Sequence, residues 1–154
     1  MPIDNSIDFV GINIAVITIS DSRTLENDTS GDTLEKRINE AGHHMMKRTI
    51  IPDDVSQIKE TLTSMSKLKE IDCIITTGGT GLTGRDTTPE AVKEIANKHI
   101  DGFGELFRQV SFNKIGTSAI QSRAVAALIN STYVFCLPGS TGACKDGWDE
   151  ILKY

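Results

Sequence analysis

Residues 73–91 read CIITTGGTGLTGRDTTPEA, and this stretch decides the fold. Its apolar first part stops at Thr76, a Gly- and Thr-rich segment follows, and Thr88-Pro89 opens a helical pattern. Proline is favoured at the first helical position because the N–H that it lacks would have no partner there. The stretch therefore predicts a strand, a loop and a helix in succession. Four glycines exceed what a plain turn needs, and Asp86 follows them closely.

Other apolar runs predict further strands of the same sheet. The predicted strands are residues 12–19, 45–51, 71–77 and 133–137. The first of them, INIAVITI, is rich in β-branched residues and apolar enough to be buried on both faces. Asn130-Ser131 fits the tip of a hairpin that leads into the last strand, whereas residues 118–127 fit either a helix or a strand.

Helical patterns lie between these strands. The expected N-caps are Ser30 or Asp32 for a first helix, Asp54 for a second, Thr88 for a third, and Ser140 or Thr141 for a last helix over 143–152. The second helix has the clearest pattern, with apolar residues at helical spacing from Val55 to Leu68, and Gln57 completes a capping box. Leu106, Phe107 and Val110 suggest another short helix.

Strands that alternate with helices predict βαβ units and a mainly parallel sheet covered on both sides. The fold class is therefore α/β, in one domain over residues 1–154. Ligands of such sheets bind at the carboxyl ends of the strands. The loops expected at those ends are 20–31, 52–54, 76–88 and 138–142. Two of these loops carry a carboxylate directly after a strand, and two are rich in glycine and hydroxyl groups.

Bulk composition excludes several classes of protein. A net charge of -5 and a pI near 5.2 argue against non-specific nucleic-acid binding, which needs a basic face. No apolar run approaches the roughly 20 residues of a membrane span, and the acidic N-terminus, MPIDNSIDFV, does not fit a secretory signal. Cys73, Cys136 and Cys144 are expected to be reduced thiols. We therefore expect a cytoplasmic protein without nucleic-acid or membrane partners.

The Gly-rich loop does not fit a P-loop. Gly79 to Gly84 has the spacing of that motif, but Arg85 and Asp86 stand where Lys and Ser/Thr are required. Backbone N–H groups and the hydroxyls of Thr76, Thr77 and Thr80 fit a cradle for an anionic ligand. Asp86 fits a Mg²⁺ ligand, and Arg85 fits either a phosphate contact or a cap for Asp86. Alternatively, Asp86 and Asp53 are turn residues and Arg85 is a surface charge.

Residues 76–91, TTGGTGLTGRDTTPEA, resemble the signature of the MoaB/MogA family of molybdenum-cofactor biosynthesis proteins, which gephyrin-type domains share. Further matches follow in the same order as in the family: ITISDSRT, DTSGD, IPDD, DGFGELFR, GTSAIQSRA and LPGST. The resemblance covers nearly the whole chain, and the C-terminal part is closer to MoaB than to MogA. Gly84, where many relatives have Pro, and PGSTGA in place of PGSPKA depart from the pattern.

The resemblance implies a three-layer α/β/α fold and a trimer or hexamer. It also implies adenylylation of molybdopterin, in which the terminal phosphate of the pterin attacks the α-phosphate of MgATP and releases pyrophosphate. The family's two essential acidic residues correspond to Asp53 and Asp86, the implied catalytic residues and Mg²⁺ ligands. The implied substrate-binding residues are Ser20, Asp21, Ser22, Thr76, Thr77, Gly78, Gly79, Thr80, Gly81, Arg85, Ser140 and Thr141.

Two other functions compete with adenylyl transfer. The first is a pterin-binding MoaB protein of the same pathway that does not turn over its ligand. The second is a sugar- or nucleotide-phosphate-binding domain unrelated to molybdenum, which the full-length match disfavours. The presence of both Asp53 and Asp86 favours the enzyme.

Overall fold

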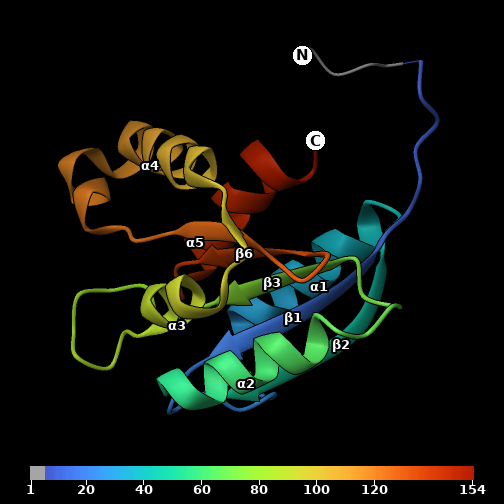
Figure 1. Cartoon of the computed structure of the whole chain (residues 1–154). Coiled ribbons are helices and arrows are strands. Elements are labelled where there is room, and N and C mark those ends of the chain that lie inside the picture. The colour runs from blue at the N-terminus through green and yellow to red at the C-terminus, as the bar shows by residue number, and fades with distance from the viewer. Residues whose placement is uncertain (1–5) are drawn as a thin grey trace.

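The computed structural model describes residues 6–154, which form one six-stranded, mostly parallel sheet with five α-helices around it (Figure 1). The strands are β1 (Asn13–Ile19), β2 (His44–Ile51), β3 (Cys73–Thr77), β4 (Lys98–His99), β5 (Val125–Ile129) and β6 (Thr132–Leu137). Their order across the sheet is β2-β1-β3-β6-β5-β4. Strands β2, β1, β3 and β6 run parallel, and β5 is antiparallel to both β6 and β4. The α/β prediction is confirmed.

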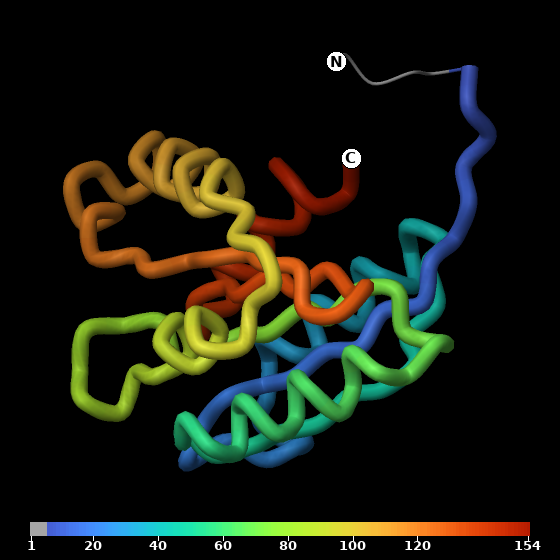
Figure 2. The backbone as a smooth tube through the Cα atoms, viewed as in Figure 1, coloured from blue at the N-terminus to red at the C-terminus, as the bar shows by residue number. Residues whose placement is uncertain are grey.

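Helices cover both faces of the sheet and make three layers. They are α1 (Thr29–Glu40), α2 (Val55–Met65), α3 (Thr88–Ile95), α4 (Asp101–Ile115) and α5 (Thr141–Gly147), with a 3₁₀ segment η1 (Gly116–Gln121) and a π-helical segment η2 (Trp148–Leu152). Helices α2 and α3 pack on one face, and α1, α4 and α5 pack on the other. The tube in Figure 2 shows the chain crossing repeatedly between these layers.

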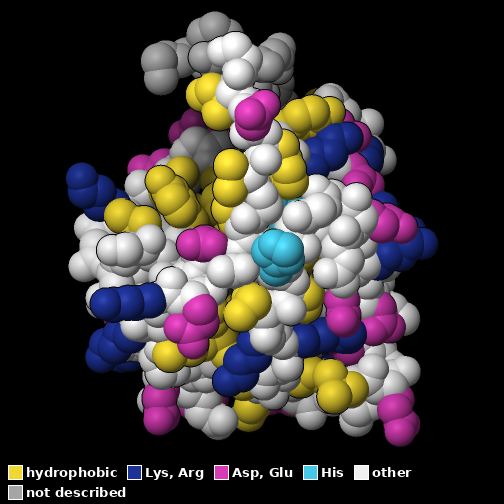
Figure 3. Space-filling model, turned by 90° about the vertical axis from the view of Figure 1, so that its right-hand side faces the viewer, with side chains coloured by type: hydrophobic (Ala, Val, Ile, Leu, Met, Phe, Trp, Pro, Cys, Tyr) yellow, Lys and Arg dark blue, Asp and Glu magenta, His cyan; other side chains and the backbone are white. Residues whose placement is uncertain are grey.

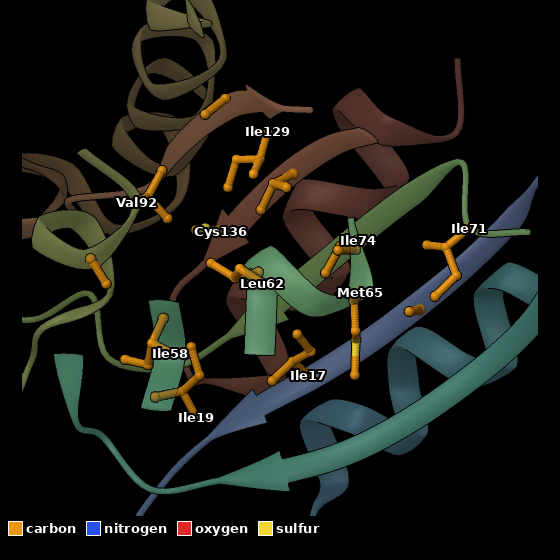
Figure 4. Close-up of a cluster of buried hydrophobic side chains, with 14 residues drawn as sticks. Ile17, Ile19, Ile58, Leu62, Met65, Ile71, Ile74, Val92, Ile129 and Cys136 are labelled. Carbon is orange, nitrogen blue, oxygen red and sulfur yellow. The ribbon is translucent and has the colours of Figure 1, made fainter. Parts of the chain in front are cut away.

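Period-two alternation along β1 divides its side chains between the two cores. Ile17 and Ile19 join the core under α2 and α3, where Ile58, Leu62 and Val92 meet them (Figure 4). The opposite core contains alternate β1 residues with side chains from α1, α4 and α5: Ile14, Val16, Leu34, Ile38, Phe103, Phe107 and Cys144. Burial on both faces explains why the β1 sequence is apolar throughout.

Several predicted boundaries are corrected by the structure. The cap of α1 is Asp28, not Ser30 or Asp32, because its buried carboxylate accepts a hydrogen bond from Gly31 N at 3.0 Å. Helix α4 extends over 15 residues and is longer than the short helix predicted, and Leu68 lies beyond the end of α2. The predicted last helix divides into α5, capped by Ser140, and η2.

The ambiguous residues 118–127 divide between η1 and β5. Strand β5 then forms an antiparallel hairpin with β6, whose tip contains Asn130 at φ 55°, as the hairpin prediction required. Strand β4 has only two residues, so it offers no pattern that could predict it. Between residues 6 and 154, the helices are too short or too polar for any of them to cross a membrane.

Strand register brings the predicted site loops together. Thr18 of β1 pairs with Thr77 of β3, and Thr77 pairs with Leu137 of β6. Ile19 pairs with Ile51 of β2. The loops that follow these four strands therefore leave the sheet at one edge, the left-hand side of Figure 1.

Candidate active site

A cleft of about 710 Å³ lies at the carboxyl ends of the parallel strands. Its walls include most of the predicted site residues: Asp53, Asp86, Ser20, Asp21, Ser22, Gly78, Gly79, Thr80, Gly81, Arg85 and Ser140. Every loop that was expected to converge supplies at least one of them. The cleft therefore gathers most of the predicted site residues in one place.

Three predicted ligand-contact residues do not line the cleft: Thr76, Thr77 and Thr141. Thr76 and Thr77 are fully buried beneath the loop. Thr77 Oγ1 donates a hydrogen bond to Pro138 O at 3.0 Å, so this hydroxyl joins two loops. Thr141 Oγ1 lies 2.9 Å from Thr29 Oγ1 and links α5 to α1. Sequence could place these hydroxyls near the site but could not tell a supporting role from a lining one.

Asp53 follows β2 and is 9% exposed. Its Oδ1 accepts hydrogen bonds from Thr87 N at 3.0 Å and from Thr87 Oγ1 at 2.7 Å. Its backbone N–H donates to Asp21 Oδ1 at 3.2 Å. Within the described residues, Asp53 Oδ2 accepts no hydrogen bond. One carboxylate oxygen is therefore anchored to the Gly-rich loop, and the other is available.

Asp86 is held inside the same loop. Its Oδ2 accepts hydrogen bonds from Thr83 N at 2.9 Å and Thr83 Oγ1 at 2.7 Å. The hydrogen bond from the Thr83 hydroxyl is the main reason that the pKa of Asp86 lies below its ordinary value. Asp86 therefore has the turn-forming contacts of the simpler interpretation and is also an ionised carboxylate on the cleft wall.

The glycines make room for these carboxylates. A Cβ added at Gly79 would lie 2.8 Å from Asp53 Oδ2, and one added at Gly81 would lie 2.7 Å from Asp86 Oδ2. Real Cβ atoms do not approach oxygen so closely, and Gly79 also has φ +65°, which L-residues rarely adopt. The bare backbone therefore lets two carboxylates lie directly against the loop.

Arg85 pairs with Asp21 instead of capping Asp86. Its Nη2 and Nε donate to Asp21 Oδ2 at 2.6 and 3.1 Å, across the mouth of the cleft. The hydrogen bond from Arg85 is the main cause that lowers the pKa of Asp21. Both side chains are substantially exposed, so this pair contributes little to stability and can exchange partners. The expected cap for Asp86 is supplied by Thr83.

Comparison with known proteins identifies the family. A family model described as "Probable molybdopterin binding domain" matches residues 15–154. The chain belongs to this family. It is 41% identical to the molybdenum cofactor biosynthesis protein B of Escherichia coli (strain K12) over 147 residues, which cover 96% of this chain and 86% of that protein.

Solved structures agree with this membership. The crystal structure of a molybdenum cofactor biosynthesis protein B has a TM-score of 0.90 at 39% identity and covers 94% of this chain and 90% of its own. The tungsten cofactor synthesizing protein MoaB from Pyrococcus furiosus has a TM-score of 0.81 at 34% identity, with 92% and 91% covered. The MoaB/MogA resemblance and its three-layer fold are confirmed.

One wall of the cleft in this MoaB/MogA chain was not predicted from the sequence. Helix α4 and η1 supply Phe107, Ser111, Ile115 and Gln121, and α5 supplies Asp146. The segments DGFGELFR and GTSAIQSRA were family matches without an assigned role. The sequence predicted a helix at Leu106, Phe107 and Val110, but only the tertiary structure shows that Phe107 lines the cleft.

The carboxylates fit Mg²⁺ by the chemistry of their donor atoms. Mg²⁺ prefers oxygen ligands and keeps several waters, so one or two carboxylates and substrate phosphates complete a site. Asp53 Oδ2 is available, and Asp86 is ionised and lies on the same cleft wall. Among residues 6–154, no group of three or more acidic, His or Cys side chains could hold a metal ion. These residues therefore suit an ion shared with a phosphate ligand better than a resident metal.

Proposed function

We propose that this protein binds molybdopterin in the cleft and adenylylates it with MgATP. One observation carries the proposal: Asp53 and Asp86 both lie against the same Gly-rich loop, at the edge where the parallel strands end. Membership of the molybdopterin-binding family supports the pterin as ligand. The name of the Escherichia coli relative supports a place in molybdenum-cofactor biosynthesis.

The proposed reaction needs no nucleophilic side chain. An oxygen of the pterin's terminal phosphate attacks the α-phosphorus of ATP, the bond from this phosphorus to the bridging oxygen breaks, and pyrophosphate leaves. The protein aligns the two phosphates and limits the repulsion between them. Backbone N–H groups of the Gly-rich loop and the hydroxyls of Ser20, Thr80 and Ser140 would hold phosphate oxygens.

The charged side chains have separate roles in this proposal. Asp53 and Asp86 would hold Mg²⁺, which when bound neutralises phosphate charge. Arg85 would exchange Asp21 for a phosphate oxygen, since the exposed ion pair is weak. The net acidity of the cleft then explains why ATP would enter with its metal ion.

A direct assay tests the proposal. The purified protein is incubated with molybdopterin and MgATP, and the products are separated to detect adenylylated pterin and pyrophosphate. We expect both products in equal amounts, and neither without Mg²⁺. Pterin binding with ATP left intact, under conditions where an active family enzyme turns over, would reduce the function to pterin binding.

We also propose that the protein assembles into a trimer or hexamer in the cytoplasm. Large apolar side chains on α4 and η1 are exposed in the single chain: Leu106, Phe112, Ile115 and Ile120. The cysteines are buried and unpaired, as in proteins of a reducing compartment. Light scattering across the micromolar range measures the assembly, and a monomer throughout this range would contradict it.

A further inference from the structure

Arg123 lies behind the Gly-rich loop, holds this loop at two points, and also contacts the first turn of α3. Its Nε donates to Gly81 O at 2.8 Å and its Nη2 donates to Asp86 O at 2.7 Å. Its Nη1 donates to Glu90 Oε1 in the first turn of α3. Arg123 follows η1, so it links the end of the α4 layer to the loop that begins at β3. In Figure 1, this loop extends from the body of the protein, with η1 above it.

Through its hydrogen bond to Asp86 O, Arg123 acts on both catalytic candidates, Asp53 and Asp86. Asp86 O and Thr87 N belong to one planar peptide unit. Arg123 holds the oxygen of this unit, and Asp53 Oδ1 accepts from its N–H at 3.0 Å. Rotation of this peptide would move the Asp86 backbone and break a hydrogen bond that anchors Asp53. One guanidinium therefore fixes the relative placement of the two carboxylates.

The hydrogen bond from Arg123 to Gly81 O restrains the other side of the loop as well. Gly81 is the position against which the Asp86 carboxylate lies, and Arg123 Nε holds its carbonyl. An arginine can reach both carbonyls because its donors lie in one rigid plane. A lysine at this position would keep the charge but supply only one compact donor group.

Arg123 and Arg85 are not equivalent. Arg85 is exposed, and among residues 6–154 its side chain pairs only with Asp21, so it is available to a ligand. Arg123 is 28% exposed, and all its hydrogen bonds within the described residues are to the loop and to α3. The hydrogen bond from Arg123 also holds the pKa of Glu90 below its ordinary value, so this partner stays charged.

We propose that Arg123 is a positioning residue that fixes Asp53 and Asp86 relative to each other for metal-dependent chemistry. It acts through the peptide that joins Asp86 to Thr87 and does not contact substrate. The inference rests on the proposed function for its effect on turnover, but the effect on the loop itself can be measured without turnover.

The test uses Arg123→Lys, with Arg108→Lys as a matched control. Arg108 Nη1 lies 3.5 Å from Ser122 O and from Ala124 O, on either side of Arg123 along the chain, and does not contact the loop. Hydrogen exchange of the peptide that contains Thr87, Mn²⁺ affinity, pterin affinity without metal, and kcat are measured for the parent and both variants. Thermal unfolding confirms that each variant is folded.

We expect Arg123→Lys to speed exchange at Thr87 about tenfold or more, because charge-assisted hydrogen bonds that hold the peptide are lost. Mn²⁺ affinity and kcat should each fall about tenfold or more for the same reason. Pterin affinity without metal should stay within about threefold of the parent, since Arg123 contacts no ligand. Arg108→Lys should leave all four values close to those of the parent.

The results separate this inference from the proposed function. Unchanged exchange and Mn²⁺ affinity in folded Arg123→Lys overturn the inference, whether or not the parent is an enzyme. Faster exchange with parental kcat also overturns it, because the loop would then be free of any catalytic requirement. Faster exchange and weaker Mn²⁺ binding, with a parent that never adenylylates pterin, retain Arg123 as the positioning residue and reject the adenylyltransferase.

Discussion

The cleft at the carboxyl ends of the strands and a groove at their amino ends have similar sizes, about 710 and 910 Å³. The amino-end groove is lined by apolar side chains, among them Leu68, Ile71, Tyr133 and Phe135, and by polar side chains that include Lys67, Lys69 and Asp72. Figure 3 views this end and shows hydrophobic side chains beside the N-terminal segment, with acidic and basic side chains interspersed. Volume alone would favour the amino-end groove over the cleft that holds the predicted site residues.

The chain connects strands and helices differently at the two ends of the sheet. At the carboxyl ends, β3 and β6 pass through Gly-rich loops into α3 and α5, and both loops and the first turn of α5 line the cleft. At the amino ends, α2 finishes at Met65, and the hairpin between β5 and β6 turns. Convergent polar groups, and not the size of the hollow, favour the carboxyl-end cleft as the candidate binding site.

Among the substitutions, Gly79→Val should have the largest effect on ligand binding in the carboxyl-end cleft. We expect Gly79→Val to weaken pterin binding about 100-fold or more, because its Cβ would overlap Asp53 and Thr88 and its φ is strained. Gly84→Ala is the matched control in the same loop, since nothing lies within 4 Å of its added Cβ. Pterin titration of both variants gives the measurement, and normal binding by folded Gly79→Val would show that the loop is no cradle.

Asp53→Asn and Asp86→Asn should separate binding from chemistry. Each keeps the shape and removes one charge, so Mg²⁺-dependent turnover should fall about 100-fold or more, while metal-free pterin binding stays the same or improves slightly. Titration without metal is followed by turnover with MgATP. Parental turnover of Asp86→Asn would make Asp86 a turn residue, and loss of metal-free pterin binding would make it a direct pterin ligand.

The stability of the fold should depend on pH through the ion-pair cluster of Arg48 with Asp28, Asp32 and Glu35. Burial alone would raise the pKa of Asp28, but hydrogen bonds from Thr18, Gly31 and Arg48 hold it below the ordinary value. Its stabilisation is therefore present above about pH 4 and is lost as the pH falls through the lowered pKa. We expect Asp28→Asn to lower the free energy of unfolding by about 2 kcal/mol at pH 7.

Urea unfolding at pH 7 and pH 3 checks this prediction. The difference between parent and Asp28→Asn should shrink at pH 3, where Asp28 of the parent begins to protonate. Asp32→Asn is the control, because Asp32 meets the same Arg48 but is largely exposed, and it should cost about 0.5 kcal/mol or less. Equal losses at both pH values would mean that the charge of Asp28 does not stabilise the fold.

Substitutions at the amino-end groove should have the smallest effect. Lys67→Ala combined with Lys69→Ala removes basic side chains that could attract a phosphate there. Pterin affinity and turnover should stay within about twofold of the parent, since surface changes distant from a site rarely do more. A tenfold loss of pterin affinity would move the binding site to this end and reverse the comparison.

Local sequence determined much of this protein. Apolar β-branched runs specified β1, β3 and β6, because a strand covered on both faces must be apolar throughout. The order of strand, Gly-rich loop and Pro-started helix specified the unit around residues 73–91, and the loops after four strands indicated the cleft. The residue pattern alone fits Asp53 and Asp86 as turn residues equally well, and the family resemblance singled them out.

Only the tertiary structure decided which of these groups face the ligand. The sequence offered Thr76, Thr77 and Thr80 as equal hydroxyls, and the packing of the loop on β6 and α5 buries the first two beneath it. It presented Arg123 as one residue of a motif, although its partners Gly81, Asp86 and Glu90 lie more than thirty positions earlier in the chain. Contacts between residues so distant arise when layers pack, and no local pattern encodes which donor meets which carbonyl.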